Sequence, residues 1–494
     1  MARRRVRKLR AADLCSGPGG VTQGYKDAGL DVVAAVDTDA RSRDTYAANH
    51  PEVKLYGDDL LKLDPKTLLE RLGIEQGQLD VLTACVPCQT FSTLGPKKKR
   101  ARDPRNRLVQ RVARFVEAIK PRALVMENVP PLVTDVRFTR LVSQLRRLDY
   151  GVRFDIVDAA QFGVPQRRRR LVLIALRGRS DDQVPALTPD HPALAGKVAR
   201  RTVRDTFTLL SDSASEDPLA KPRTNYPLLV AQRIAAVPLD GGSRNSLPPE
   251  LVLTCHSDLE HSAAANVYGR MKLDDVAPTL TTRCTTPACG RFLHPIEDRA
   301  ITLREAACLQ TFPVGYEFKG GSISIQAQIG NAVPPKLAEA IALVVVDALK
   351  KIPAAPRASS PATRTRMQRV GKRDTPAELA LRAELHRRGL RFRVDKPPLR
   401  DLRRRADIVF RPAKVAVFVD GCFWHGCPQH VTWPEANGEW WKRKIEGNRR
   451  RDADTNRRLH QAGWHVIRAW EHEDVREVAH RVALAIVRRR PVSP

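Results

Sequence analysis

Residues 9–176 repeat one pattern, in which a short apolar run is followed by a small or polar turn and then by an amphipathic segment. The apolar runs are "LRAADL", "DVVAAVD", "LDVLTAC", "RALVMEN" and "RRLVLIAL". Segments between them, such as "RLVQRVARFVEAIK", have the spacing of apolar residues that is typical of helices. Short apolar strands that alternate with helices form a doubly wound, largely parallel sheet. The pattern therefore predicts an α/β fold for this part of the chain.

The same pattern divides the chain into parts. It covers residues 1–178, is lost in 179–295, and returns in 296–349, where "TLREAACLQ" and "PPKLAEAIALVVVDALK" are predicted helices. The interrupting segment is rich in Pro, Ser, Thr and Asp and contains short apolar pieces such as "ELVLTC", which predicts an inserted and mostly β module. Residues 350–363 have the composition of a linker, and 364–494 are predicted to form a second domain.

The chain carries a formal net charge of +30. A charge of this size favours a polyanionic partner and makes binding depend on salt, although a genome that prefers arginine is an alternative explanation. The basic N-terminal segment "MARRRVRKLR" is not followed by the apolar run of a signal peptide, and no stretch has the roughly 18 apolar residues of a membrane span. We therefore expect a cytoplasmic protein whose cysteines are free for catalysis or metal binding.

The first apolar run ends in "DLCSGPGG" (13–20), a glycine-rich turn before a predicted helix. Glycines at this place let a ligand approach the backbone closely, although a merely tight turn is the alternative. The turn has neither the spacing of the dinucleotide fingerprint nor a Walker lysine, so it does not predict phosphate binding. Asp37 ends the second run, where an acidic side chain can hold ribose hydroxyls, and Asp58 follows Gly57 where a third run should end.

The segment "ACVPCQTFS" (84–92) places Cys88 just beyond an apolar run. Ligands of α/β proteins bind in the crevice outside the carboxyl ends of the strands, and a thiolate there is a competent nucleophile. Glu127 stands at the end of the run "RALVMEN", and the basic segment "QRRRR" (166–170) precedes another run. These residues predict a catalytic centre at one edge of the sheet.

Taken in order, the "DLCSGPGG" turn, the acidic strand ends, "PCQ", "ENV", "QRRRR" and "QIGNAVPP" (328–335) resemble the motifs of the cytosine-5 DNA methyltransferases. The resemblance covers about residues 1–348 and implies a Rossmann-like methyltransferase core with a target-recognition module at 179–295. It implies that Cys88 attacks C6 of a cytosine flipped out of the duplex, that Glu127 steadies N3, and that C5 receives a methyl group from S-adenosylmethionine. Arg168 and Arg170 would contact the base and the catalytic loop.

The resemblance also implies a binding site for the methyl donor at the glycine-rich turn. Asp37 would hold the ribose and Asp58 the adenine, with Asp59 as the alternative to Asp58, while Asn331 would close the pocket. The implied donor-binding residues are Asp13, Gly17, Gly19, Gly20, Asp37, Asp58 and Asn331.

Double-stranded DNA is the expected partner. The basic loop "LGPKKKRARDPRNR" (94–107) could meet phosphates, although a solvated surface run is the alternative. "APTLTTRCTTPACGRF" (277–292), in the inserted module, has Thr and Arg side chains suited to base edges. We expect a monomer that is associated with the nucleoid of a bacterium.

Beyond the linker, "VDGCFWHGCPQH" (419–430) concentrates two cysteines and two histidines in twelve positions. The predicted zinc ligands are Cys422, Cys427, His430 and His472. His425 could take the place of His430, and would then be unavailable for catalysis. Asp407 begins the apolar run "ADIVF", which is followed by the run "KVAVFVDG", and a carboxylate on such paired strands suits Mg²⁺ in a nuclease site.

Residues 364–475 resemble the very-short-patch repair endonucleases, which nick DNA beside T:G mismatches, through "RDTPAE", "RRADIVF", "VFVDGCFWHGCP", "WWKRKIEGNRRRD" and "GWHVIRAWEHE". The resemblance implies a restriction-endonuclease-like α/β domain. Asp407 would bind Mg²⁺ with Glu378 in its outer shell, and His425 would help the attacking water. Asp420 stands where some members carry a catalytic histidine, so that His425 acts alone or Asp420 adds a metal ligand. The aromatic residues implied to wedge into the base stack, unless they form a hydrophobic core, are Phe423, Trp424 and Trp441.

The pairing of the two domains has a chemical reason. Deamination of 5-methylcytosine leaves a T:G mismatch, so an enzyme that writes this base creates a mutational hazard that a tethered nickase would repair. Two alternatives stay open. The first is a restriction–modification fusion whose nuclease cuts unmethylated DNA, and the second is a non-catalytic, zinc-stabilised DNA-binding module. The adjacent Phe423 and Trp424 favour mismatch recognition over restriction.

Overall fold

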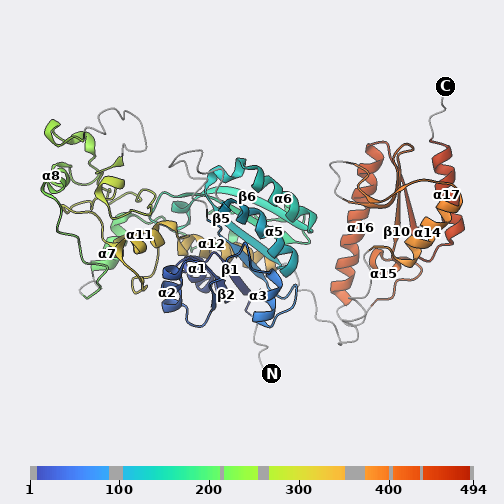
Figure 1. Ribbon diagram of the computed structural model, residues 1–494, viewed down its shortest axis with the longest axis horizontal. Coiled ribbons are helices and arrows are strands. Elements are labelled where there is room, and N and C mark those ends of the chain that lie inside the picture. The colour runs from blue at the N-terminus through green and yellow to red at the C-terminus, as the bar shows by residue number, and fades with distance from the viewer. Residues whose placement is uncertain are drawn as a thin grey trace. The chain divides into compact units, whose positions relative to one another are not determined.

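The apolar runs of the N-terminal part form one sheet of seven strands, in the order β3-β2-β1-β4-β5-β7-β6 (Figure 1). The strands are β1 (Arg10–Leu14), β2 (Asp31–Val36), β3 (Lys54–Tyr56), β4 (Val81–Ala84), β5 (Ala123–Asn128), β6 (Tyr150–Asp158) and β7 (Arg169–Arg177). Neighbours among β1 to β5 are parallel, and β7 is antiparallel to both β5 and β6. The predicted runs coincide with β1, β2, β4, β5 and β7. β6 was not predicted, because charged residues interrupt its apolar positions.

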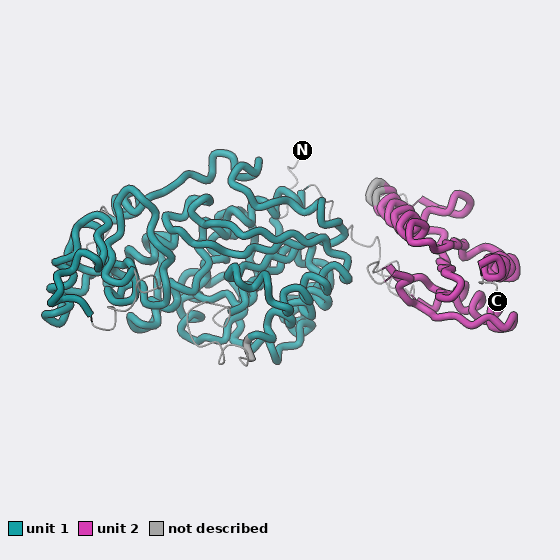
Figure 2. The backbone as a smooth tube through the Cα atoms, turned by 90° about the horizontal axis from the view of Figure 1, so that it is seen from above, with its two compact units in different colours: residues 1–352 teal, residues 353–494 magenta. Residues whose placement is uncertain are grey.

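The computed structural model divides into two compact units, Met1–Ile352 and Pro353–Pro494 (Figure 2). It describes residues 8–87, 104–211, 216–253, 266–350, 373–399, 404–433 and 438–489. Within these ranges no helix is both long enough and apolar enough to cross a membrane.

Helices cover both faces of the seven-stranded sheet (Figure 1). On one face lie α3 (Pro65–Leu72), α5 (Leu108–Ile119) and α6 (Val136–Arg147). On the other lie α1 (Gly20–Asp27), α2 (Ala40–Asn49) and α12 (Pro335–Lys350). Because successive strand residues point to opposite faces, Ala12 and Leu14 of β1 pack in the first core and Ala11 in the second. The arrangement confirms the predicted doubly wound α/β fold.

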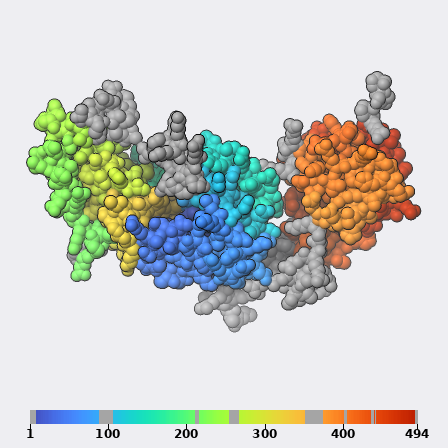
Figure 3. Space-filling view, viewed as in Figure 1, coloured from blue at the N-terminus to red at the C-terminus, as the bar shows by residue number. Residues whose placement is uncertain are grey.

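The segment that follows the inserted module rejoins this core. α10 (Leu303–Leu309) begins at Thr302, whose side chain forms a capping box with Glu305. α11 (Ser322–Asn331) comes next, and α12 then lies along α1. In Figure 3 the returning segment (yellow) lies between the inserted module (green) and the first helices (blue). Hydrogen bonds between Asn49 at the end of α2 and Glu317 fix this contact at 2.8 and 3.0 Å.

The inserted module differs from the expected, mostly β structure. Its described residues (179–211, 216–253 and 266–295) contain α7 (Val203–Ser211), α8 (Leu228–Ala236) and several short 3-10 turns, and β pairing among them is limited to isolated bridges. The expected strand "ELVLTC" (250–255) instead begins in a 3-10 turn that Pro249 opens, and its last two residues lie outside the described residues.

A buried arginine donates hydrogen bonds to backbone carbonyl oxygens that have no strand partner in this module. Arg270, which is fully buried, donates to the carbonyl oxygens of Ile234, Val237 and His294 at 2.9, 2.9 and 3.0 Å. Buried carbonyls need hydrogen-bond partners, and here one side chain supplies what strand pairing would otherwise provide. The periodicity of apolar residues carries no sign of such an arrangement.

The second unit contains a four-stranded sheet in the order β11-β10-β9-β8. Its strands are β8 (Arg393–Lys396), β9 (Ala406–Phe410), β10 (Val415–Asp420) and β11 (His465–Trp470). β10 pairs in parallel with β11 and antiparallel with β9. One face packs against α14 (Pro376–Arg387) and α17 (Val475–Val487), and the other against α16 (Gly438–Gln461) (Figure 1). The short helix α15 (Cys422–His425) follows β10 directly.

Candidate active sites

The glycine-rich turn after β1 has the close backbone approach that its sequence predicted. Gly17 and Gly19 adopt positive φ angles of 53° and 99°, which glycine tolerates without strain. The Gly17 N–H donates to Asp37 Oδ2 at 2.7 Å, so the turn is tied to the end of β2. At Gly20 a Cβ would lie 2.3 Å from the Val333 carbonyl oxygen, so α1 can start here only because the residue has no side chain.

Buried polar atoms without a partner surround this turn. Among the described residues, Asp13 Oδ1 and Ser16 Oγ are buried and accept or donate no hydrogen bond. The other oxygen of Asp13 accepts from Thr22 Oγ1 at 3.2 Å, and burial raises the pKa of Asp13 to about 8. Burial also raises the pKa of Asp37. Such atoms are costly unless a ligand satisfies them, so the turn fits a ligand with hydroxyl and amino groups.

The other predicted donor residues lie at two further places. Asp58 follows β3 and forms an ion pair with Arg71 at 2.6 Å. Asp59 Oδ1 accepts the Leu61 N–H at 2.9 Å, so each of the two alternatives already has a partner in the protein. Asn331 is exposed at the end of α11.

Glu127 lies at the end of β5 with its side chain nearly buried. Its Oε1 is 2.9 Å from Arg170 Nε, so the predicted acid and one of the two predicted arginines form an ion pair. The neighbouring Asn128 donates to the Val86 carbonyl at 3.0 Å, which ties this strand end to the segment that leads to Cys88. Cys88 and the basic loop up to residue 103 lie outside the described residues, so their roles stay predictions.

Arg168 is buried between the core and the inserted module. It is 2 % exposed and donates to the carbonyl oxygens of Leu280, Gly330 and Ala332, at 3.3, 3.1 and 3.0 Å. The guanidinium therefore joins the inserted module and the end of α11 to the core. These contacts give Arg168 a structural task, and its predicted contact with the base and the catalytic loop stays a prediction.

Tyr316 and His50 stabilise the glycine-rich turn after β1, a role that was not predicted from the sequence. The Tyr316 hydroxyl donates to the Pro18 carbonyl at 2.5 Å and lies 3.0 Å from His50 Nε2. Burial, together with the nearby Lys26 ammonium, lowers the pKa of His50 to about 4. Neither residue belongs to a recognisable motif, and only their shared contact with the turn reveals them.

In the second unit, Asp407 lies in β9 and accepts the Val419 N–H of β10 at 2.8 Å. Burial raises the pKa of Asp407 to about 6, and the nearby Glu378 and Asp420 add to the rise. Among the described residues these carboxylates do not form a group that could hold a metal ion by themselves, so the binding of Mg²⁺ at Asp407 stays a prediction. Glu378 is already held in the first turn of α14, where it accepts from the Asp374 N–H at 3.0 Å and from Arg382 at 2.8 Å.

Asp420 and His425 belong to one network of charged groups. Arg468 Nη1 lies 2.7 and 2.6 Å from the two oxygens of Asp420. His425 Nδ1 lies 2.6 Å from Asp452 Oδ2, and Arg468 Nη2 donates to the other oxygen of Asp452 at 2.9 Å. Asp452 and Arg468 were not predicted. The available signal was a single arginine within the otherwise apolar end of β11, "HVIRAW".

The predicted zinc ligands come together. The donor atoms of Cys422, Cys427, His430 and His472 all lie within 4.8 Å of one another, and Cys422 Sγ is 3.0 Å from His472 Nδ1. His425, the alternative fourth ligand, is outside this group because its Nδ1 contacts Asp452. Two sulfur and two nitrogen donors at this spacing fit a tetrahedral zinc ion.

The three predicted wedge residues pack against one another. The ring centroids of Phe423, Trp424 and Trp441 lie 5.0 to 5.8 Å apart with edge-to-face geometry. Trp441 is 8 % exposed, whereas Phe423 and Trp424 are half-buried. Trp441 therefore supports the other two rings, and only Phe423 and Trp424 offer surface for contact with a base step.

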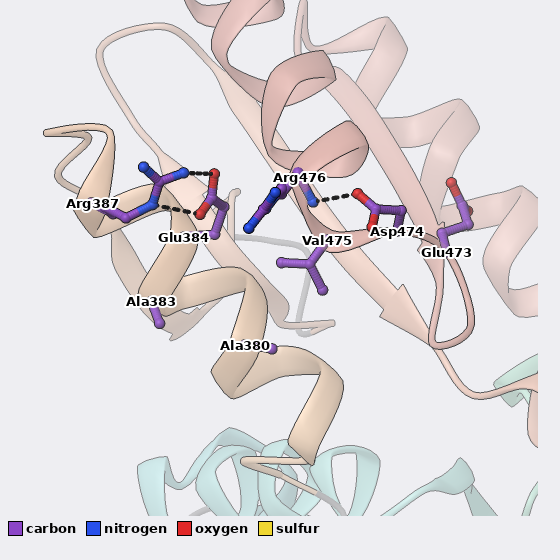
Figure 4. A pocket seen from close by; sticks show the side chains of 8 residues that line it. All are labelled: Ala380, Ala383, Glu384, Arg387, Glu473, Asp474, Val475 and Arg476. Carbon is purple, nitrogen blue, oxygen red and sulfur yellow. Dashed lines mark hydrogen bonds and ion pairs between the residues drawn. The ribbon is translucent and has the colours of Figure 1, made fainter.

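A depression between α14 and α17 holds none of the predicted site residues. Its walls include the Glu384–Arg387 ion pair on α14 and Asp474 and Arg476 at the start of α17 (Figure 4). Apart from this ion pair, Asp474 accepts the backbone N–H groups of Arg476 and Glu477 as the N-cap of α17.

The first unit is a doubly wound α/β fold with a strand-end site, and the second is an α/β unit with a Cys and His group that could hold a metal ion. Residues 9–347 match the family model of C-5 cytosine-specific DNA methylases, and residues 358–430 match that of the DNA mismatch endonuclease Vsr. The chain belongs to the C-5 cytosine-specific DNA methylase family and carries a Vsr endonuclease domain in addition. Both resemblances that the sequence suggested are thereby confirmed.

Individual relatives agree with this assignment. The chain is 35 % identical over 343 residues to the Type II methylase M.HgiDII of Herpetosiphon aurantiacus, covering 67 % of this chain and 93 % of the relative. It is 34 % identical to the Type II methyltransferase M1.HphI of Haemophilus parahaemolyticus, covering 68 % and 86 %. A DNA modification methyltransferase encoded within an E. coli prophage shares the fold, with a TM-score of 0.50, 23 % identity, and coverage of 69 % of this chain and all of that one.

Proposed function

We propose that the first unit transfers a methyl group from S-adenosylmethionine to C5 of a flipped-out cytosine in a specific double-stranded DNA sequence, through a covalent adduct with Cys88. The observation that carries the proposal is the joint position of the donor turn and Glu127. β1 and β5 flank β4, and all three run in parallel, so their carboxyl ends meet at one edge of the sheet. The Type II names of the relatives support action at a defined sequence.

The residues divide the chemistry between them. C5 of cytosine is a poor nucleophile until a thiolate forms a bond to C6, which is the role of Cys88. Charge then accumulates toward N3, where Glu127, held by Arg170 at 2.9 Å, is the acid that steadies it. The donor, when bound, supplies the methyl group. Loss of the C5 proton and departure of the thiolate from C6 restore the aromatic ring and the free enzyme.

The donor would be held by the turn after β1. Asp37 would accept the ribose hydroxyls, and the unpartnered Asp13 Oδ1 and Ser16 Oγ would meet polar groups of the donor. Asp58 can reach an adenine amino group only if it releases Arg71 in part, since the two form an ion pair at 2.6 Å.

Two substitutions test the methyl-transfer proposal. Cys88→Ser should abolish transfer of labelled methyl groups to DNA while leaving donor binding unchanged, because the cysteine acts on the base and not on the donor. Glu127→Gln should lower the rate constant by about 100-fold or more, as expected for a lost general acid. Methyl transfer by Cys88→Ser at the wild-type rate would refute the covalent route.

We also propose that the second unit nicks DNA at T:G mismatches that arise from deaminated 5-methylcytosine. Mg²⁺ would bind at Asp407 beside Glu378, and zinc at Cys422, Cys427, His430 and His472 would be structural. Phe423 and Trp424 are half-buried and pack against Trp441. They support the proposal of mismatch recognition, because apolar rings stabilise an unstacked base step.

A plasmid experiment tests this second proposal without knowledge of the target sequence. The protein methylates a plasmid, part of the product is deaminated, and the strands are annealed to untreated complements. Nicks with Mg²⁺ only in this heteroduplex support repair, double-strand breaks in unmethylated plasmid support restriction, and no breaks support a binding module. Asp407→Asn should abolish cleavage, whereas the control Glu477→Gln, an exposed carboxylate on α17, should not.

A further inference from the structure

Arg468 occupies an unusual position for a charged side chain. It lies in β11, paired with Phe418 of β10, and its guanidinium lies 4.9 Å from the centroid of the Phe418 ring. Each of its nitrogen atoms has a partner. Nη1 contacts both oxygens of Asp420, Nη2 donates to Asp452 at 2.9 Å, and Nε donates to Asn456 Oδ1 at 3.2 Å.

These contacts connect separate elements of the fold. Asp420 ends β10, whereas Asp452 and Asn456 lie one turn apart on α16. The second oxygen of Asp452 is 2.6 Å from His425 Nδ1. Asp420, Arg468, Asp452 and His425 therefore form one continuous series of hydrogen-bonded side chains.

We infer that Arg468 is a positioning residue for the proposed strand cleavage, which holds Asp452 so that Asp452 in turn fixes the ring of His425. His425 Nδ1 lies 2.6 Å from Asp452 Oδ2 and 3.5 Å from Asp420 Oδ1, so the two carboxylates orient the ring and Nε2 is the nitrogen left to contact an attacking water. Asp420, with both oxygens on Arg468, belongs to this clamp and is not a metal ligand. The inference rests on the proposed nuclease function of this unit.

The planar guanidinium is essential to this arrangement. Its Nη1 faces Asp420 while its Nη2 faces Asp452, so that a single group is shared between two carboxylates in fixed directions. A lysine ammonium keeps the charge but cannot hold both carboxylates in the same plane. Arg468→Lys should therefore preserve the fold and lose much of the cleavage rate.

The test uses the full chain on a T:G-containing duplex. Arg468→Ala should lower kcat by about 100-fold, in the range of a lost general base, with little change in KM for DNA. Arg468→Lys should retain an intermediate rate, and added guanidinium ion should partly restore Arg468→Ala. The control Arg481→Ala, which removes an exposed partner of Glu473 on α17, should behave as wild type. A raised KM with unchanged kcat would identify Arg468 as a DNA contact and overturn the inference.

A second measurement is independent of cleavage. Nitrogen-15 spectra of labelled histidine in the full chain report which ring nitrogen carries the proton, and His425→Gln assigns the signal. We expect a protonated Nδ1 in the wild type, and loss of this preference in Arg468→Ala with zinc content unchanged. If the preference persists in Arg468→Ala, the inference is wrong. If the wild type does not nick mismatched DNA, the proposed function fails, and the spectra still decide the role of Arg468.

Discussion

The two catalytic units hold their sites by different physical means. In the methyltransferase unit, the donor turn and its neighbours are fixed by backbone contacts that leave no room for a Cβ, as at Gly20, Gly24 and Gly330. In the endonuclease unit, the site depends on carboxylates, Arg468 and a group of Cys and His side chains. The first site should therefore be sensitive to added volume, and the second to the loss of charge or metal.

Removal of metal should have the largest effect, and only in the endonuclease unit. Without an ion, the four donor atoms that lie within 4.8 Å of one another lose their common partner. Structural zinc contributes on the order of 10 kcal/mol to the folding of small domains. We expect a chelator, or Cys427→Ser, to unfold this unit and leave the methyltransferase unit intact.

The aromatic residues allow the two units to be followed separately. All six tryptophans lie between residues 424 and 470, and all seven tyrosines lie in the first unit. Chelation should therefore change the tryptophan fluorescence, as Trp441 and Trp464 become exposed, without changing the tyrosine signal in near-ultraviolet circular dichroism. Unchanged fluorescence after complete metal removal would show that the Cys and His group is not needed for folding.

An added methyl group at the α1–α12 contact should have the next largest effect, now in the other unit. A Cβ at Gly24 would lie 2.2 Å from the Pro335 carbonyl oxygen and 2.6 Å from the Glu339 nitrogen, both backbone atoms. Gly24→Ala should cost about 3 kcal/mol or more in the free energy of unfolding, because neither helix can move without disturbing the core. Gly315→Ala is the matched control, since a Cβ there meets nothing within 4 Å. Equal tyrosine-detected melting of the two variants would contradict the backbone-contact account.

Much of this architecture was predictable from sequence, because it depends on local patterns. Apolar runs buried on both faces mark β1, β4 and β5, and the residues that follow them stand at the strand ends whatever the rest of the chain does. Fixed spacing along the chain likewise brought Cys422 and Cys427 together. Asp407 was predictable for the same reason, since it lies within an apolar strand.

The features that were missed depend on contacts between distant segments. Arg168 reaches Gly330, 162 positions away, and Arg468 reaches Asp420 across 48 positions. The inserted module was expected to be mostly β because short apolar pieces resemble strands, whereas its carbonyls are satisfied by the buried Arg270. A side chain that pairs with distant backbone leaves no periodic trace in the sequence.

Low pH should reduce the free energy of unfolding of the methyltransferase unit through His50, by no more than the glycine substitution does. The pKa of buried His50 is lowered to about 4, so the folded state does not bind a proton that the unfolded state binds below its ordinary pKa of 6.5. Stability is therefore full above pH 6.5 and falls as the pH drops from 6.5 toward 4. The loss should be about 3 kcal/mol, because the two pKa values differ by about 2.5 units and each unit corresponds to about 1.4 kcal/mol. Urea unfolding followed by tyrosine should show this slope in the wild type and a flatter one in His50→Gln, and equal slopes would exclude His50 as the cause.

The smallest predicted effect is a gain in stability, and it tests whether the endonuclease unit tolerates added volume at a glycine. Gly447 lies inside α16, and a Cβ there would meet nothing within 4 Å, so its glycine serves no close contact. Gly447→Ala should stabilise the endonuclease unit by about 0.5 to 1 kcal/mol, because alanine loses less backbone entropy in a helix. Gly426→Ala, in the same unit, should do the opposite, since Gly426 has a φ of +65° and a Cβ would lie 2.7 Å from Ile445. Melting of both variants is measured by tryptophan fluorescence. If Gly447→Ala also destabilises the endonuclease unit, this unit depends on close contacts at its glycines in the same way as the methyltransferase unit.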